Sequence, residues 1–148
     1  MYTIGQVSEL FNIPVSTLRY YDKEGFFPNL KRVGNIRKFD EAELEALKVI
    51  ECLKKSGLEI KDIRQFFEWV SKGSASYLDR KELFEHRKDA VKQQIKSLET
   101  TLAMLEFKCW YYEKAMADGN EEQIKAMLPD KLPPDIQALY DKAHNQKG

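Results

Sequence analysis

The sequence predicts a mainly helical protein, in which two short helices and a small β-hairpin precede two further helices, one very long helix and a short helical tail. Three patterns support this fold class. Apolar residues recur at helical spacing on both sides of a turn at Asn12–Ile13, β-forming residues flank Gly34–Asn35, and an apolar heptad repeat runs from Val91 to Met116. The 148 residues suffice for one small domain with an appendage.

The first two predicted helices form a pair joined by a short turn. Thr3 and Gln6 have the spacing of a capping box at the start of the first helix. The apolar residues that follow at helical spacing are Ile4, Val7, Leu10 and Phe11. Pro14 suits the first position of the second helix, because its missing N–H costs nothing there, and Gly25 ends that helix. This pattern is typical of a helix-turn-helix, and a plain helical hairpin is the alternative.

The second helix carries residue types that contact nucleic acids. Hydroxyl and N–H groups at a helix N-terminus can bind phosphate oxygens, and arginine and tyrosine side chains can reach the backbone or the base edges. Leu18 is the one strongly apolar residue of the next turn and is expected to point inward. We expect DNA contacts from Ser16, Thr17, Arg19, Tyr20 and Tyr21.

A short two-stranded wing is expected after the second helix. Gly34–Asn35 is a turn signal, and its neighbours Val33 and Ile36 favour β-structure. The basic residues expected on the wing, and at the DNA, are Lys31, Arg32, Arg37 and Lys38. Residues 1–38 hold six Lys or Arg and three Asp or Glu, whereas the whole chain has no net charge. A DNA-binding face requires such a local excess of positive charge.

Several of these segments together resemble the signature of the MerR family of transcriptional regulators. They are Tyr2-Thr-Ile-Gly, Ser16-Thr-Leu-Arg-Tyr-Tyr-Asp, Glu24-Gly-Phe, Pro28 and Gly34-Asn-Ile-Arg-Lys-Phe. The sequence departs from the family pattern at two positions. Asn12 stands where Gly is frequent, and Asn tolerates left-handed geometry. Phe39 stands where Tyr is common, so a hydroxyl contact to phosphate is lost there.

The resemblance implies a function and a mechanism. MerR-like proteins are homodimers that bind double-stranded promoter DNA with an over-long spacer, and they distort it for RNA polymerase when a signal activates them. Such specificity rests partly on DNA deformability. The alternative is an effector-independent, excisionase-like architectural winged-helix protein. The long helix argues against that alternative, because a monomeric architectural module does not need one.

Beyond the wing, the sequence predicts three further helices and a tail. A capping box at Asp40–Glu43 starts the third helix, and the fourth follows Gly57. We expect a winged helix-turn-helix DNA-binding domain at residues 1–74, a coiled-coil dimerisation helix at 75–119 and a short C-terminal effector or tail segment at 120–148.

The long helix carries a seam of apolar residues spaced alternately by four and three positions. The seam residues are Val91, Ile95, Leu98, Leu102, Leu105, Cys109, Tyr112 and Met116. An amphipathic helix of this length needs a partner, and a second copy of the chain is the expected one. The family resemblance implies an antiparallel dimer. The alternative is that the seam packs against the tail.

The two cysteines have different surroundings. Cys109 lies on the seam, where it packs as a small hydrophobe. Cys52 lies off the apolar arc of the third helix, with Lys48 and Lys55 on the same face, and ammonium groups favour a reactive thiolate. The resemblance extends to the thiol-based branch that responds to aldehyde or nitrosative stress. Cys52 is therefore the candidate sensor of an electrophile, and packing against the partner's coil is the alternative.

An aromatic cluster stands near the end of the long helix. Phe107, Trp110 and Tyr111 are a candidate effector pocket for a small molecule, shared with the tail and with a partner helix. Most aromatic residues at such positions are core residues, and that interpretation stays open beside the pocket.

Other function classes find no support in the sequence. The two histidines have no spacing that suits nucleophilic or metal-assisted catalysis, and no Gly-rich phosphate loop is present, so we expect neither an enzyme nor a cofactor. Cys109 has no second thiol nearby, which argues against a metal site. The sequence shows no membrane-spanning run and no signal-peptide core, so a cytoplasmic protein is expected.

Overall fold

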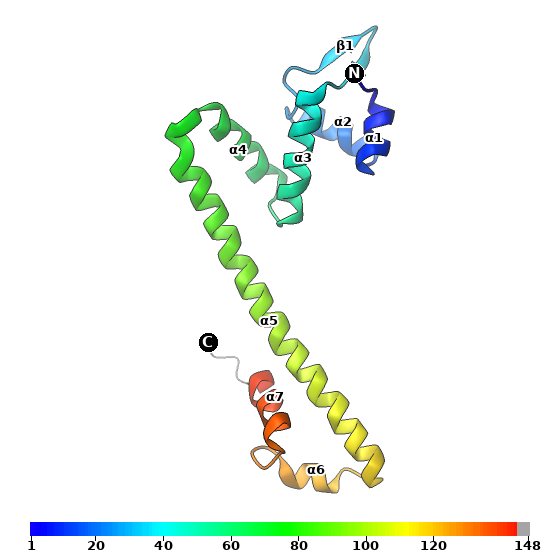
Figure 1. Ribbon diagram of the computed structural model, residues 1–148, viewed down its shortest axis with the longest axis vertical. Helices are drawn as coiled ribbons and strands as arrows, with labels where there is room; N and C mark the ends of the chain where they lie inside the picture. The colour runs from blue at the N-terminus through cyan, green and yellow to red at the C-terminus, as the bar shows by residue number, and fades with distance from the viewer. Residues whose placement is uncertain (145–148) are drawn as a thin grey trace. The chain divides into compact units, whose positions relative to one another are not determined.

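The computed structural model describes residues 1–144 and divides into two compact units, one ending at Arg87 and one beginning at Lys88 (Figure 1). The elements in chain order are α1 (Ile4–Phe11), α2 (Val15–Lys23), β1 (Lys31–Val33), β2 (Ile36–Lys38), α3 (Glu41–Lys55), α4 (Ile60–Ser71), the 3-10 turn η1 (Gly73–Ser76), α5 (Tyr77–Asp118), α6 (Glu122–Met127) and α7 (Pro134–His144). The predicted fold class, mainly helical with a wing, one long helix and a helical tail, is confirmed.

The helix-turn-helix is formed by α1 and α2. The predicted capping box is present, since the Thr3 hydroxyl accepts from the Gln6 N–H and the Gln6 side chain accepts from the Thr3 N–H. Asn12 ends α1 in the left-handed conformation at φ 54° and ψ 47°. Pro14 has an extended ψ of 143° and is the N-cap of α2, so α2 begins at Val15, one residue later than predicted.

The wing is an antiparallel hairpin closed by a two-residue turn. Gly34 and Asn35 both have positive φ values, 57° and 65°, which suits the tight turns that match strand twist. Lys31 pairs with Lys38 and Arg32 with Arg37 across the ladder. Directly after β2, Phe39 exchanges two backbone hydrogen bonds with Tyr2, each 2.8 Å long, so the wing is joined to the start of the chain.

The core of the first unit surrounds the inner face of α2. Leu18 and Tyr21 are 0% and 1% exposed, and they belong to one core cluster with apolar residues of α1, α3 and α4. The buried core residues are Val7, Ile13, Leu18, Tyr21, Phe26, Phe27, Phe39, Leu44, Leu47, Ile50, Leu53, Leu58 and Ile63. This packing buries the inner face of α2 and leaves its outer face in solvent. The core therefore determines which side chains of α2 are exposed.

The first turns of α5 are attached to the end of α3. The Arg87 guanidinium donates to the carbonyl of Ser56, where it also complements the negative end of the α3 dipole. Gly57 follows with φ +94°, and a Cβ there would overlap the Arg87 guanidinium. Phe84 adds an edge-on contact to Phe66 of α4. Gly57 therefore meets two requirements, a left-handed backbone and an open face for Arg87.

The second unit consists of the later part of α5, α6 and α7. A small core joins the tail to α5 through the buried residues Phe107, Leu132 and Ile136. Tyr111 donates a hydrogen bond to Glu121, which raises the pKa of Tyr111 to about 12. In Figure 1, α7 runs back alongside α5.

The tail does not cover the predicted seam. The core under the tail uses Phe107, Trp110 and Tyr111, and none of the seam residues belongs to it. On the opposite side of α5, seam side chains remain exposed, with Leu98 at 68%, Leu102 at 54% and Met116 at 83%.

Within residues 1–144, no helix combines the length and the apolar character needed to cross a membrane.

Candidate nucleic-acid interface

The outer face of α2 presents the predicted contact residues. Ser16 and Arg19 are exposed, Thr17 is half-buried, and Tyr20 is 44% exposed. Pro14 supplies no side-chain cap, so the positive end of the helix dipole remains available to an anion such as a phosphate. Four of the five predicted side chains of α2 are thus placed where DNA could reach them.

Tyr21 is the exception and corrects the prediction for this residue. Its ring is buried against Phe26 at a centroid distance of 5.8 Å. Its hydroxyl donates to Glu51 at 3.0 Å and accepts from Lys54 at 2.7 Å, and both partners belong to α3. Burial raises the pKa of Tyr21 above its usual value. Tyr21 therefore orients α2 on α3 and is not part of the contact surface.

The wing brings basic side chains beside α2. Arg32 and Arg37 both donate to one carboxylate oxygen of Asp22, over 2.9 Å and 2.8 Å. Lys31 is exposed and lies 3.4 Å from Asp40, and Lys38 is half-buried. All four predicted wing cations lie on the hairpin, and two of them are tied to α2 by Asp22. Sequence reasoning missed this role of Asp22.

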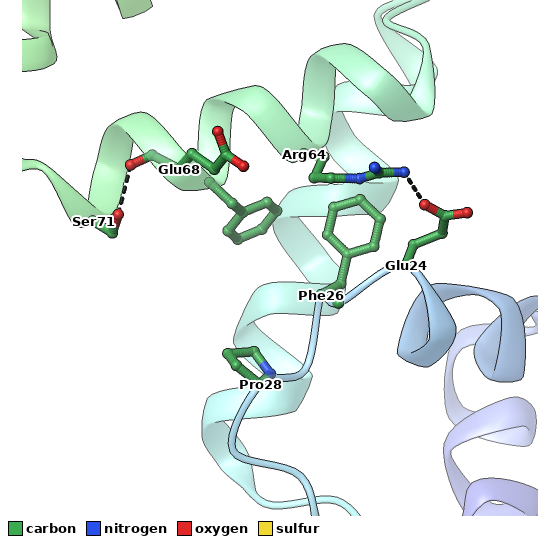
Figure 2. Close-up of a pocket in the computed structure, with 8 residues that line it drawn as sticks. Glu24, Phe26, Pro28, Arg64, Glu68 and Ser71 are labelled. Atoms are coloured by element: carbon green, nitrogen blue, oxygen red, sulfur yellow. Dashed lines mark hydrogen bonds and ion pairs between the residues drawn. The ribbon is translucent and has the colours of Figure 1, made fainter.

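Behind α2, an ion pair connects the end of the helix to α4. Glu24, the C-cap of α2, is paired with Arg64 of α4. This pair lies at one side of a cavity of about 350 Å³. Figure 2 shows Phe26 next to the pair, Pro28 farther along the loop, and Glu68 and Ser71 at the other side. The ion pair and the edge-on ring contact between Phe26 and Phe67 hold α4 against the turn after α2. No local sequence signal marks this contact, because its partners are 40 residues apart.

The comparisons with known proteins agree with this architecture. The family model "MerR HTH family regulatory protein" matches residues 2–68, and the model "MerR, DNA binding" matches residues 44–106. An uncharacterised HTH-type transcriptional regulator of Haemophilus influenzae is 39% identical over 134 residues, which cover 89% of this chain and 96% of that protein. The chain belongs to the MerR family. It is therefore a DNA-binding transcriptional regulator.

Solved structures of MerR regulators have the same fold. HiNmlR, described as a MerR family regulator lacking the sensor domain and bound to promoter DNA, is 38% identical to this chain with a TM-score of 0.64. That match covers 82% of this chain and 98% of HiNmlR. A MerR regulator from Bacillus thuringiensis is also 38% identical, with a TM-score of 0.58 and coverage of 73% and 96%.

The other predicted site residues have distinct surroundings in this MerR protein. Cys52 and Cys109 are both exposed thiols in the single chain. Lys48, one of the two cations expected to activate Cys52, donates to Glu45 at 2.9 Å. Phe107 is only 4% exposed, so it belongs to the core beneath the tail. Trp110 and Tyr111 are half-buried beside it.

Replacement of Tyr21 by Phe tests the role of the buried hydroxyl. Loss of the shared hydrogen bonds to Glu51 and Lys54 should lower the free energy of unfolding by about 1 kcal/mol. DNA affinity should stay within about twofold, a change worth less than one hydrogen bond. Urea unfolding and gel-shift titration measure the two quantities. A large loss of DNA affinity with an unchanged free energy of unfolding would show that Tyr21 belongs to the contact surface.

Proposed function

We propose that this MerR-family regulator binds a promoter as a homodimer and distorts an over-long spacer in response to a signal, so that RNA polymerase can use the promoter. It acts in the cytoplasm without enzymatic activity or a resident cofactor. The observation that carries the proposal is the link through Asp22 between α2, whose outer face is polar and exposed, and the basic wing. HiNmlR, a similar protein, is described as bound to promoter DNA.

The DNA surface in this proposal consists of α2 and the wing. The helix residues are Ser16, Thr17, Arg19 and Tyr20, and the wing residues are Lys31, Arg32, Arg37 and Lys38. Exposed Arg19 bears the single positive charge at the middle of α2, where it can bind a phosphate or enter a groove. The wing supplies further positive charge, which can bind the flanking phosphates or enter a groove.

The homodimer in this proposal forms through the exposed seam of α5. The seam residues Ile95, Leu98, Leu102 and Leu105 are between 51% and 68% exposed in the single chain. A contiguous apolar stripe of this kind is unfavourable in water and marks a protein interface. Since the tail covers the opposite face of α5, a second copy of the chain is the partner that the heptad spacing fits.

The signal in this proposal is an electrophile that modifies Cys52. Cys52 is exposed on α3, one turn before the Ser56 carbonyl that Arg87 of α5 binds. A small-molecule effector at Trp110 and Tyr111 is the second candidate, supported by the aromatic cluster between α5 and the tail. An architectural protein without a signal is the competing function, and promoter activation that needs no modification would support it.

Replacement of Arg19 by Ala tests the DNA surface. A DNA pool selected by the wild-type protein from random sequences supplies the operator. Loss of one phosphate contact should weaken binding to all sequences and lower the slope of log K against log salt by about one unit. Lys125→Ala, an equal loss of charge on α6, is the matched control and should change neither quantity. An unchanged slope for Arg19→Ala would place the DNA surface elsewhere.

Replacement of Leu102 by Asp tests the dimer. A carboxylate inside an apolar interface should cost on the order of several kcal/mol, so the variant should sediment as a monomer and lose operator binding. Gln93→Asp adds the same charge at an exposed position off the seam and should remain dimeric. Analytical ultracentrifugation measures both. A dimeric Leu102→Asp protein would show that the seam is not the interface.

Brief alkylation of the native protein tests the sensor. Iodoacetamide should label Cys52 before Cys109, because the dimer covers Cys109, and Leu102→Asp should expose Cys109 to the reagent. Mass spectrometry gives the order of labelling. Cys52→Ser should bind the operator and fail to activate transcription after exposure to an aldehyde. A normal response by Cys52→Ser would instead favour a small-molecule effector bound at Trp110 and Tyr111.

A further inference from the structure

Asp22 lies at the junction of the recognition helix and the wing. Its Oδ2 atom accepts from the Arg37 Nε–H at 2.8 Å and from Arg32 Nη2 at 2.9 Å. The Asp22 side chain is 13% exposed, against 25% for Arg37 and 49% for Arg32. The carboxylate is therefore the more buried member of both pairs, in a setting where charge-assisted hydrogen bonds fix geometry.

The wing alone cannot orient its arginines. It has three residues in each strand, and an isolated hairpin of that size is at best marginally stable. Arg32 and Arg37 stand directly opposite each other in the ladder, where like charges repel. The two apolar residues of the strands add little burial, since Val33 is 59% and Ile36 is 56% exposed. Asp22 offsets part of the repulsion between the two arginines and joins them to α2.

Asp22 leaves both arginines able to bind DNA. Each guanidinium has five N–H donors in a fixed plane, and Asp22 receives a bond from one nitrogen of each. The remaining donors are held in one orientation relative to α2. A carboxylate near phosphates also opposes DNA in general, so Asp22 weakens non-specific attraction while it orders the specific contacts.

We propose that Asp22 is a positioning residue that gives this regulator its discrimination between operator and other DNA, acting through Arg32 and Arg37. The proposal rests on the DNA-binding function proposed above. It differs from a simple charge effect in one consequence. Removal of the Asp22 charge should weaken operator binding and leave non-specific binding unchanged or tighter, whereas a charge effect would shift both in the same direction.

The decisive comparison is between Asp22→Asn and Asp40→Asn. Both remove one negative charge beside a wing cation, and Asp40 is paired only loosely with Lys31 at 3.4 Å. Asn also caps a helix as well as Asp does, so α3 keeps its N-cap. We expect Asp22→Asn to lower the ratio of operator affinity to non-specific affinity by about tenfold, which is the loss of one well-placed charge-assisted contact. Asp40→Asn should leave the ratio within about twofold, as expected for an exposed pair.

A mutant cycle tests whether Asp22 acts through the arginine. Once Arg37→Ala is present, Asp22→Asn should reduce the ratio far less than it does in the wild type. If each substitution lowers the affinity ratio by its own independent factor, so that the two factors multiply in the double mutant, the proposal is wrong. An unchanged ratio for Asp22→Asn would also overturn it, as would an equal loss of binding to both kinds of DNA with a lower unfolding temperature, which would mark a general structural role.

A measurement without DNA separates this proposal from the proposed function. In the DNA-free protein, the Arg37 Nε–H should exchange slowly with water in the wild type and in Asp40→Asn, and at least severalfold faster in Asp22→Asn. Nuclear magnetic resonance of the arginine side chains records these rates. Equal exchange in all three proteins would overturn the positioning role. If the wild-type protein selects no DNA sequence although exchange follows the expected order, the proposed function fails and Asp22 still positions the wing.

Discussion

The DNA-binding unit depends on burial of the inner face of α2. A nine-residue helix is not stable alone in water, so tertiary packing must hold it. Leu18 and Tyr21 lie one turn apart on the same face and are almost fully buried. Their burial fixes the rotation of α2 about its axis. That rotation in turn exposes Ser16, Arg19 and Tyr20 together, so the proposed DNA face is a consequence of core packing.

Features set by neighbouring residues were predictable from the sequence, and features set by distant residues were not. Asn12 and the Gly34–Asn35 turn have the left-handed backbone that their residue types favour. The burial of Tyr21 had a usable signal, because it stands three residues after Leu18 and shares its face. The role of Asp22 had none, since its partners lie 10 and 15 residues away and meet it only in the folded unit.

The later part of α5 shows why a periodic apolar pattern predicts that a helix face is buried but does not identify the segment that packs on it. Two apolar faces run along this segment, one through Ala103 and Phe107 and the other through the seam that contains Leu98 and Leu102. Both faces have the spacing of a helix that packs against another helix. The tail covers the first face through Leu132, which lies between α6 and α7, and through residues of both helices. Only the three-dimensional structure could show this.

The joint between α3 and α5 gives the proposed sensor a direct physical route to the long helix. The Cys52 carbonyl accepts the Ser56 N–H at 3.2 Å, and the Ser56 carbonyl accepts from Arg87. A change in the last turn of α3 therefore moves an acceptor of Arg87 itself, and Gly57 leaves no side chain between the turn and the guanidinium. If Cys52 is the sensor, as proposed, its modification would therefore act first on the attachment of α5 to α3, which is not among the contacts that join α2 to the wing.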